Sequence, residues 1–317
     1  MKLINQKAEL LIQPKGLNGL EKQIEIAART CYKSENNSTG DSKSFVDKLI
    51  KMKHFSMLEH GTVYLKFDQS KVPDTMVSKY YLNPYSRAKF RDESSIAYIT
   101  TNYRVLLEHG WTKDLQYWCE PTNNHVKRYT FRLTTSVSIV RELLRHRVFS
   151  FANESTRFIN YNKKGEFYFI KPYWYEESDK DVKNRFDYIC NAAIAAYNFM
   201  LQHNYPPQAA REVLPLCTKS ELIMTGFEDD WKNFLDIRLK GTTGKPHPDM
   251  VELAQLIEDE LCKVNKVIKI RTIHEPSFDD TTKYNNEFPL LKDALDKQKK
   301  TACKYLDEYS LEVNPEI

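Results

Sequence analysis

The segment from Arg145 to Arg157 concentrates the recognition chemistry of this sequence. Its thirteen residues carry three arginines, a histidine, three hydroxyls, an amide and a carboxylate. Arginine suits phosphate binding, because its planar fork of donors meets two oxygens at once and stays charged at any working pH. The spacing from Arg145-His146-Arg147 to Ser155 and Arg157 favours a site for phosphate or another polyanion. The alternative is a solvated helix end followed by a polar loop.

Two arginines elsewhere are candidates for the same site. Arg211 lies in a mostly apolar helix end and Arg238 in a similar segment, where an unpaired guanidinium would be costly. Each pairs either with an acid of the chain, such as Glu212 beside Arg211, or with a ligand anion. His60 follows Glu59 just before an expected strand, where its imidazole either donates to a ligand or caps a turn.

Several common kinds of site are absent from the sequence. It has no H-E-x-x-H motif and no cysteine and histidine group at metal-ligand spacing, so no metal site is expected. Glu228, Asp229 and Asp230 are better explained as an acidic helix start, because carboxylates favour the positive end of the helix dipole. There is no G-x-G-x-x-G loop, P-loop or G-x-S-x-G elbow, and only nine glycines. Arginine side chains would therefore have to hold any phosphates.

The composition is that of an ordinary folded protein. Of the 317 residues, 41% are hydrophobic and 28% charged, and the net charge of +4 is too small to indicate a nucleic-acid partner by itself. No apolar run approaches the roughly 20 residues that cross a bilayer, so no membrane partner is expected. The six cysteines are scattered, and nothing resembles a signal peptide. We therefore expect a cytoplasmic protein with reduced thiols.

Strand-like patterns place the candidate residues on a sheet. Residues 62–67 and 167–170 have the β-branched and aromatic content of strands. Residues 127–135 alternate aromatic and leucine side chains with arginine and threonine, which predicts a half-buried strand. This strand runs into a helix expected at 136–147, so Arg145 and its neighbours would lie at a helix end.

Helical patterns account for most of the remaining chain. Residues 68–126 are interpreted as an elaboration of the core, with one helix at 95–109. Apolar periodicity or alanine-rich stretches predict further helices at 17–34, 45–50, 181–203, 207–214, 229–239 and 248–264, and an amphipathic tail at 289–309.

The segment from Arg145 to Arg157 also resembles a motif of a known family. It reads R-H-R at Arg145-His146-Arg147, then seven residues, then S-x-R at Ser155-Thr156-Arg157, and in this it resembles the flavin-dependent thymidylate synthases. Residues 27–34 are similar to the family's first helix. Other similar segments are 56–62 (its E-H start of a strand), 210–215 (A-R-x-x-L-P), 233–238 (N-F-L-x-L-R) and 247–248. Together these segments cover most of residues 17–262.

The resemblance implies a fold and a domain organisation. The family has the α+β fold of thymidylate synthase-complementing proteins, an antiparallel sheet flanked by helices. The expected domain spans 1–264, with an insertion at about 68–126, and a helical C-terminal extension would follow at 265–317. Members of the family assemble as homotetramers whose active sites are shared between subunits.

The resemblance also implies an activity in dTMP biosynthesis. The family consists of methyltransferases that convert dUMP to dTMP, with 5,10-methylenetetrahydrofolate supplying the carbon and NADPH supplying reducing equivalents through FAD. Uracil must become electron-rich at C5 before it attacks a one-carbon electrophile, and a guanidinium beside the ring stabilises the ionised form. The resemblance assigns this catalytic role to Arg238, at the uracil edge, and requires no cysteine nucleophile.

Binding residues follow from the resemblance by position. Arg145, His146 and Arg147 would contact FAD, supported by Thr62, Asn153 and Asn233. The dUMP site would be formed by two stretches of chain and two separate arginines, namely Glu142, Leu143, Leu144, Arg145, Asn153, Glu154, Ser155, Thr156, Arg157, Arg211 and Arg238.

The sequence departs from the family pattern at two places. An Asn-x-Arg pair that contacts flavin in the family is replaced by Phe227 and Asp229, and Asn153 stands where Glu or Gln is common. One interpretation is that residues of the insertion replace the contacts of the Asn-x-Arg pair, and that Glu154 compensates for the shorter side chain of Asn153. Another is a nucleotide-binding relative without synthase activity. A nucleic-acid-binding protein is a third interpretation, disfavoured by the near-neutral charge balance.

Overall fold

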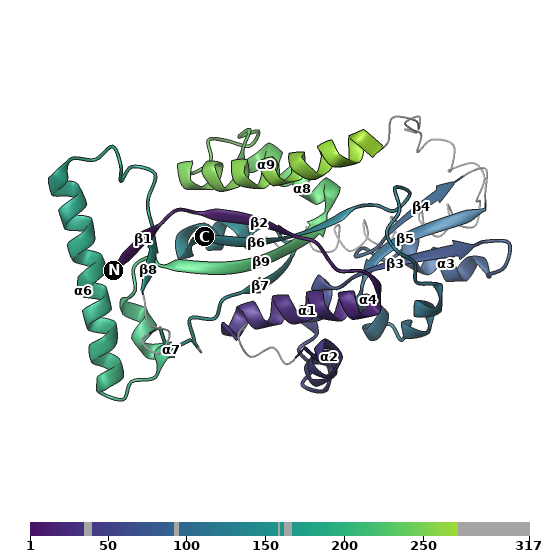
Figure 1. The fold of residues 1–317 in the computed structure, drawn as a ribbon, viewed down its shortest axis with the longest axis horizontal. Coiled ribbons are helices and arrows are strands. Elements are labelled where there is room, and N and C mark those ends of the chain that lie inside the picture. Colours follow the sequence, from purple (N-terminus) through teal and green to yellow (C-terminus); the bar gives the residue numbers. More distant parts are fainter. Residues whose placement is uncertain (35–39, 92–94, 158, 162–166, 272–317) are drawn as a thin grey trace, which may run out of the picture. The chain divides into compact units, whose positions relative to one another are not determined.

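The computed structural model describes residues 1–34, 40–91, 95–157, 159–161 and 167–271 (Figure 1). Residues Met1–Asn265 form one compact unit, and the remainder of the chain forms a second. The amphipathic pattern at 289–309 lies outside the described residues. Within the described ranges, no helix combines the length and the apolar content that crossing a bilayer requires.

The described elements alternate between helices, short 3-10 helices (η) and strands. In chain order they are β1 (Lys2–Ile4), β2 (Lys7–Leu11), α1 (Gly16–Tyr32), α2 (Ser42–Lys51), η2 (Phe55–His60), β3 (Thr62–Asp68), α3 (Asp74–Tyr81), β4 (Arg87–Arg91), β5 (Ile96–Asn102), α4 (Tyr103–Glu108), η3 (Thr112–Tyr117), β6 (Arg128–Ser136), α5 (Val137–Leu143), β7 (Ser150–Asn153), β8 (Tyr168–Ile170), α6 (Lys180–Gln202), α7 (Pro207–Ala210), η5 (Arg211–Val213), β9 (Lys219–Phe227), α8 (Glu228–Arg238) and α9 (Pro248–Arg271).

The centre of the first unit is a four-stranded antiparallel sheet in the order β2-β6-β9-β7. Strand β9 pairs with β6 on one side, where Phe227 lies opposite Arg128, and with β7 on the other, where Thr225 lies opposite Ser150. This sheet and its flanking helices confirm the predicted α+β class.

Helices cover both faces of the four-stranded sheet, with α8 and α9 on one side and α1 on the other (Figure 1). On the first side, Met224 of β9 packs in one core with Trp231 and Phe234 of α8. On the second side, the neighbouring residue Ile223 packs against Ala27 of α1. Strand β9 is therefore buried on both faces. It shows no alternation of polar and apolar residues, which is why periodicity did not predict it.

A second, three-stranded sheet has the order β3-β5-β4. Its buried residues include Val63 and Ile99, which share a core with Leu20 and Ile24 of α1. Helix α1 thus packs against both sheets and fixes one relative to the other within the first unit.

The helix expected at 95–109 is wrong in its first half. Residues Ile96–Asn102 form β5, and only Tyr103–Glu108 are helical as α4. The run of isoleucine, tyrosine and threonine favours a strand that has neighbours on both sides, as β5 has in β3 and β4. Asn102 then starts α4, because its side chain accepts a hydrogen bond from the backbone N–H of Val105 (3.1 Å).

The other predicted helices and strands are confirmed in part. The strands expected at 62–67, 127–135 and 167–170 are confirmed as β3, β6 and β8, and helices α1, α2, α6, α8 and α9 are confirmed at or near their expected positions. The helix expected at 207–214 is short, because after α7 the chain tightens into η5. Strands β1, β2, β4, β7 and β9 and helix α3 were not predicted.

We expect Gly226→Ala to lower the free energy of unfolding by about 2 kcal/mol. An added methyl group at this position of β9 would lie 2.5 Å from the ring carbons of Phe149, so the ring must shift out of its packed position. Urea unfolding followed by tryptophan fluorescence measures the effect. The same substitution made in a Phe149→Ala background should cost much less, and an equal cost in both backgrounds would contradict this explanation.

Candidate functional site

The helix expected at 136–147 ends early, at Leu143. The next residues form a tight turn, in which the backbone N–H of Arg145 donates to the carbonyl of Glu142 (3.2 Å) and that of His146 to the carbonyl of Leu143 (3.0 Å). Phe149 then packs its ring 4.7 Å from that of Trp231, and β7 begins at the next residue. The packing of Phe149 and the pairing of β7 therefore explain why the helix ends at Leu143.

This turn presents positive charge to solvent. Arg145 and Arg147 are exposed, and within the described ranges their side chains have no hydrogen-bond or ion-pair partner. Leu144 (40% exposed) and Val148 (63% exposed) lie beside them. Two unpaired guanidinium groups flanked by exposed apolar side chains suit a ligand with both an anionic part and a flat apolar part.

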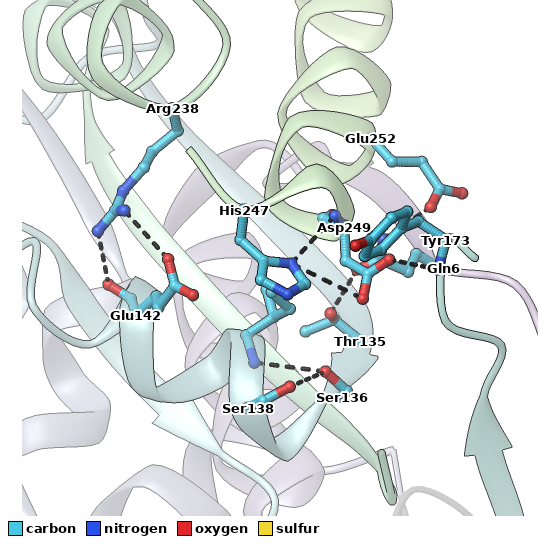
Figure 2. A network of polar contacts seen from close by, with 11 residues as sticks. Gln6, Thr135, Ser136, Ser138, Glu142, Tyr173, Arg238, His247, Asp249 and Glu252 are labelled. Carbon is cyan, nitrogen blue, oxygen red and sulfur yellow. Dashed lines mark hydrogen bonds and ion pairs between the residues drawn. The ribbon is translucent and has the colours of Figure 1, made fainter. Parts of the chain in front are cut away.

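Arg238, at the end of α8, reaches into the same turn. Its Nε donates to Nε2 of His146 (2.8 Å), and its Nη1 forms an ion pair with Oε2 of Glu142 (3.1 Å). Figure 2 shows the guanidinium extending from α8 to Glu142 on α5. The sequence left open an internal acid or a ligand anion as the partner of Arg238, and the structure supplies Glu142.

His146 accepts this hydrogen bond as a neutral imidazole. Burial and the neighbouring charge of Arg238 lower the pKa of His146 from its ordinary value of 6.5 to about 4. Acceptance at Nε2 places the ring proton on Nδ1. Arg238 carries five N–H groups and uses three of them, including a long contact to the carbonyl of Glu142 (3.4 Å). The other two N–H groups have no partner among the described residues and remain for a ligand.

The second half of the motif gathers around Arg211. The Nη1 of Arg211 donates to the hydroxyl of Thr156 (3.1 Å), and its Nε pairs with Glu212 (3.4 Å). Arg157 is exposed and donates to the side chain of Gln208 (3.0 Å). Arg211 thus contacts Thr156, and Arg157 contacts Gln208 of the adjoining helix α7, so two guanidinium groups follow β7, as a phosphate site requires.

Strand β7 separates the two halves of the motif. Its four residues span about 10 Å at the usual rise of a strand. Arg145, His146 and Arg147 precede the strand, whereas Ser155 and Arg157 follow it. A ligand contacted by both halves must therefore extend along the strand, or it takes its two sets of contacts from two copies of the chain.

Two of the expected nucleotide residues turn into the interior. Leu143 is fully buried in the core beneath α5, and the side chain of Glu154 is also fully buried. The Glu154 carboxylate is held by Lys33, Lys219 and Tyr161. Within one chain, only the backbones of these two residues remain to contact a nucleotide.

Of the residues expected to support flavin, Thr62 and Asn233 lie near the first half of the motif, whereas Asn153 lies at the far end of β7. Thr62 is buried, and its hydroxyl accepts a hydrogen bond from Nη1 of Arg128 (3.2 Å). Arg128 also donates to the hydroxyl of Ser150 (3.3 Å), directly after the motif's first half. Asn233 is exposed on α8, and the structure gives its side chain no partner among the described residues. Asn153 accepts at Oδ1 from Ser220 (3.1 Å).

His60 is structural in this chain. It is fully buried, and its Nδ1 lies 2.8 Å from the hydroxyl of Thr225 in the central strand. Burial and the nearby charge of Arg128 lower the pKa of His60 to about 3. The sequence left open a ligand contact or a turn cap for this imidazole. Its burial disfavours the first, and its side-chain partner is Thr225 of β9 rather than a turn.

Sequence reasoning missed Arg87 and Arg128. The alternation in β6 indicated that Arg128 faces solvent, but burial lowers the pKa of its guanidinium to about 10. The Arg87 guanidinium lies 4.4 Å from the centre of the Phe227 ring and that of Arg128 5.6 Å from it. Phe227, one of the two departures from the family pattern, is thus a stacking surface for two arginines. No motif or regular spacing in the sequence indicates that Arg87 and Arg128 both contact Phe227.

A separate polar network fixes the start of α9 (Figure 2). Asp249 accepts a hydrogen bond from the backbone N–H of Tyr173 (2.8 Å), and its own carbonyl accepts from the side chain of Gln6 (2.7 Å). Gln6 in turn accepts from the hydroxyl of Thr135 in β6 (2.5 Å). Burial raises the pKa of Asp249. Among the residues that the structure describes, no group of three or more His, Cys, Asp or Glu could hold a metal ion.

Comparison with known proteins gives one family match. The family model described as thymidylate synthase complementing protein matches residues 13–82 and 83–265. A flavin-dependent thymidylate synthase of Corynebacterium efficiens is 36% identical over 163 residues, which cover 47% of this chain and 59% of that protein. One of Mycobacterium bovis is 23% identical over 233 residues, or 68% of this chain and 66% of that protein. The chain thus spans slightly less than two thirds of the length of these curated relatives.

A solved structure is also similar in part. The UMP/dUMP methylase PolB from Streptomyces cacaoi, bound with 5-Br dUMP, is 18% identical and covers 83% of this chain and 93% of its own. The TM-score of this comparison is 0.41.

The free energy of unfolding should fall as the pH is lowered from 6.5 to about 4. In this range the unfolded chain takes up a proton on His146, whereas the folded protein keeps the imidazole neutral. This contribution is fully present above pH 6.5 and is lost by about pH 4, with a slope of at most about 1.4 kcal/mol per pH unit. Urea unfolding at a series of pH values measures the slope.

His146→Gln provides the comparison for this pH dependence. Glutamine keeps an acceptor for Arg238 but takes up no proton, so the slope between pH 6.5 and 4 should become shallower. His203→Gln, at an exposed position, is the control and should keep the wild-type slope. Equal slopes in all three proteins would mean that His146 is not held neutral by the fold.

Proposed function

Because the chain belongs to the thymidylate synthase complementing protein family, we propose that it is a flavin-dependent thymidylate synthase, which methylates dUMP to dTMP. The carbon would come from 5,10-methylenetetrahydrofolate, and NADPH would supply reducing equivalents through FAD. The single observation that carries the proposal is Arg238, held by neutral His146 and by Glu142 beside unpaired guanidinium groups. A cytoplasmic location stays a prediction from the cysteine pattern.

The turn after α5 fits a flavin nucleotide. Arg145 and Arg147 would meet the oxygens of its pyrophosphate, and the exposed side chains of Leu144 and Val148 offer apolar surface to a flat ring. His146 would lie beside them, and Asn233, Thr62 and Asn153 would add polar contacts. FAD, when bound, supplies hydride chemistry that no side chain can perform.

Arg238 would act at the uracil ring of dUMP. Its two remaining N–H groups would face the ring edge, where the guanidinium stabilises the negative charge that develops as C5 becomes electron-rich. Glu142 and His146 already hold the guanidinium, so little reorganisation accompanies the reaction. Leu143, Leu144 and Arg145 would line the same side of the nucleotide, the buried Leu143 through its backbone.

The phosphate of dUMP would lie at the far end of β7. Ser155 offers a hydroxyl there, and Arg157 and Arg211 offer guanidinium groups, with Thr156 held by Arg211. Asn153 and Glu154 would contribute through the backbone next to Ser155. Because β7 separates this group from Arg238, we propose that one nucleotide takes the two sets of contacts from different subunits of a homotetramer.

The outer face of α6 supports this assembly. Tyr188, Ile189 and Phe199 are exposed there at 65%, 56% and 59%, and Ala192 and Ala195 lie between them on the exposed side of the helix. Small residues among large apolar ones permit close helix packing, and an apolar stripe of this kind is typical of an interface. We propose that a second copy of the chain covers this face.

A nucleotide-binding relative without synthase activity is the second candidate. Phe227 and Asp229 favour it, because the ring of Phe227 is buried against Arg87 and Arg128 and offers a ligand no polar contact. The two candidates differ in whether purified protein takes up FAD and turns over dUMP.

Purified protein should bind FAD and convert dUMP to dTMP when NADPH and methylenetetrahydrofolate are present. Arg238→Gln should reduce turnover by at least about 100-fold, because charge stabilisation at the uracil ring is lost. Flavin absorbance after gel filtration and dTMP formation measured by chromatography are the readouts. Wild-type protein that takes up no FAD would refute the synthase proposal.

Arg104→Gln is the control for this measurement. Arg104 pairs with Glu108 on α4 (2.9 Å), so its replacement removes a guanidinium away from the proposed site. Its turnover should stay within about twofold of wild type. Wild-type turnover in Arg238→Gln would show that the role assigned to Arg238 is wrong.

Ile189→Asp combined with Phe199→Asp should dissociate the assembly, because two buried carboxylates would face an apolar partner surface. Light scattering after gel filtration measures the mass against 37.3 kDa per chain. Met52→Asp changes an exposed apolar residue outside α6 and should keep the wild-type mass. A wild-type monomer, or a mutant as large as wild type, would contradict an interface on α6.

A further inference from the structure

A buried group of charges lies directly behind the second half of the motif. The carboxylate of Glu154 is fully buried and forms ion pairs with Lys33 (3.0 Å) and Lys219 (3.1 Å), whose side chains are 19% and 8% exposed. Lys219 also pairs with Glu221 (2.6 Å). Two lysines and two glutamates thus balance their charges in the interior.

Hydrogen bonds complete the environment of Glu154. The hydroxyl of Tyr161 donates to its Oε1 (2.9 Å), and the backbone N–H of Glu221 donates to its Oε2 (3.2 Å). Burial, reinforced by the negative charge of Glu154, raises the pKa of Tyr161, so the phenol stays protonated as a donor. Burial alone would lower the pKa of Lys219, but Glu154 and Glu221 outweigh it and raise the pKa.

We call this group the Glu154 cluster (Lys33, Glu154, Tyr161, Lys219 and Glu221). A contribution to the free energy of unfolding does not by itself account for its burial. Taking ions out of water costs several kcal/mol each, and well-packed apolar side chains usually stabilise an interior as well or better. An ionic cluster also fixes the orientation of the chain segments that carry it, because each charged group is satisfied by few arrangements of its partners.

The Glu154 cluster fixes the orientation of the backbone that leads from β7 into the proposed phosphate site. Beyond β7, the backbone N–H of Glu154 donates to the carbonyl of Glu221 (2.7 Å), and that of Ser155 donates to the carbonyl of Cys31 at the end of α1 (2.9 Å). Ser155 follows with a partly exposed side chain, and its carbonyl accepts a hydrogen bond from the backbone N–H of Ile159 (3.2 Å) as the chain turns. Its hydroxyl has no partner among the described residues.

We propose that Lys33, Tyr161 and Lys219 are positioning residues for the nucleotide phosphate site, acting through Glu154 on Ser155 and the residues that follow it. This role rests on the proposed function, because it takes Ser155 and Arg157 as phosphate contacts. Glu154 then serves the nucleotide without touching it through its side chain.

The position of the Glu154 cluster gives the proposal a selective consequence. The cluster lies at the end of β7 that leads to Ser155, whereas Arg145 and Arg147 lie at the other end. Loosening the cluster should therefore weaken dUMP binding much more than FAD binding, to which this end of β7 would contribute only Asn153. A role in stability alone would affect both ligands together.

Two variants test this selectivity. Lys219→Met keeps length but removes the charge, and should weaken dUMP binding by about tenfold, while FAD affinity stays within about twofold. Tyr161→Phe removes a single hydroxyl and should weaken dUMP binding about threefold. Titration calorimetry with dUMP, quenching of flavin fluorescence and urea unfolding supply the three readouts on the assembled protein.

Lys43→Met is the matched control, because Lys43 forms an exposed ion pair with Asp47 (2.8 Å) and should leave both affinities unchanged. The proposal is overturned if folded Lys219→Met and Tyr161→Phe bind dUMP as wild type does, or if both ligands weaken in step with lost stability. If Lys219→Met does not fold, Tyr161→Phe alone decides. Wild-type protein that binds no dUMP would instead remove the proposed function.

Discussion

The pairing of β9 with strands on both sides is the constraint on which the rest of the structure depends. Its register with β6 places Phe227 opposite Arg128, and its register with β7 places Thr225 opposite Ser150. One end of β7 then leads to the turn with Arg145, and the other end leads to Ser155. A slip of one residue would turn every side chain of β7 to the opposite face and expose Glu154, so the buried ion pairs and the ladder specify the same register.

The two ends of β7 use charge in different ways. At one end, Arg145 and Arg147 form no ion pair among the described residues, and Arg238 is held by a neutral imidazole and one carboxylate. At the other end, Glu154 lies in the interior, fully compensated by lysines. The first arrangement leaves positive charge that a ligand can pair with. In the second, the charges pair with one another and fix the conformation of the chain. Both arrangements include residues of the same thirteen-residue segment, and each is completed by residues from other parts of the chain.

Local patterns predicted α1, α2, α6, α8, α9 and the family motif well, because amphipathic periodicity and motif spacing are properties of neighbouring residues. The same patterns failed where burial comes from distant segments. Strand β9 is buried on both faces and has no alternation. Arg128 was predicted to face solvent, but η2 and β3 cover it. The family resemblance named Glu154 and Arg238 as site residues, but it could not indicate that one carboxylate points inward or that Glu142 pairs with the arginine. Such contacts depend on how the sheet assembles.

The parallel pair β1 and β8 has a consequence for how the chain is made. Lys2 lies opposite Tyr168, so the first strand has no partner until more than half of the protein has left the ribosome. At about 5–20 residues per second, this wait lasts roughly ten to thirty seconds. Pairing between such distant segments also closes slowly once both are present. During synthesis the edge of β1 is therefore open to chaperones and proteases, and it becomes protected only when the segment leading to α6 has folded.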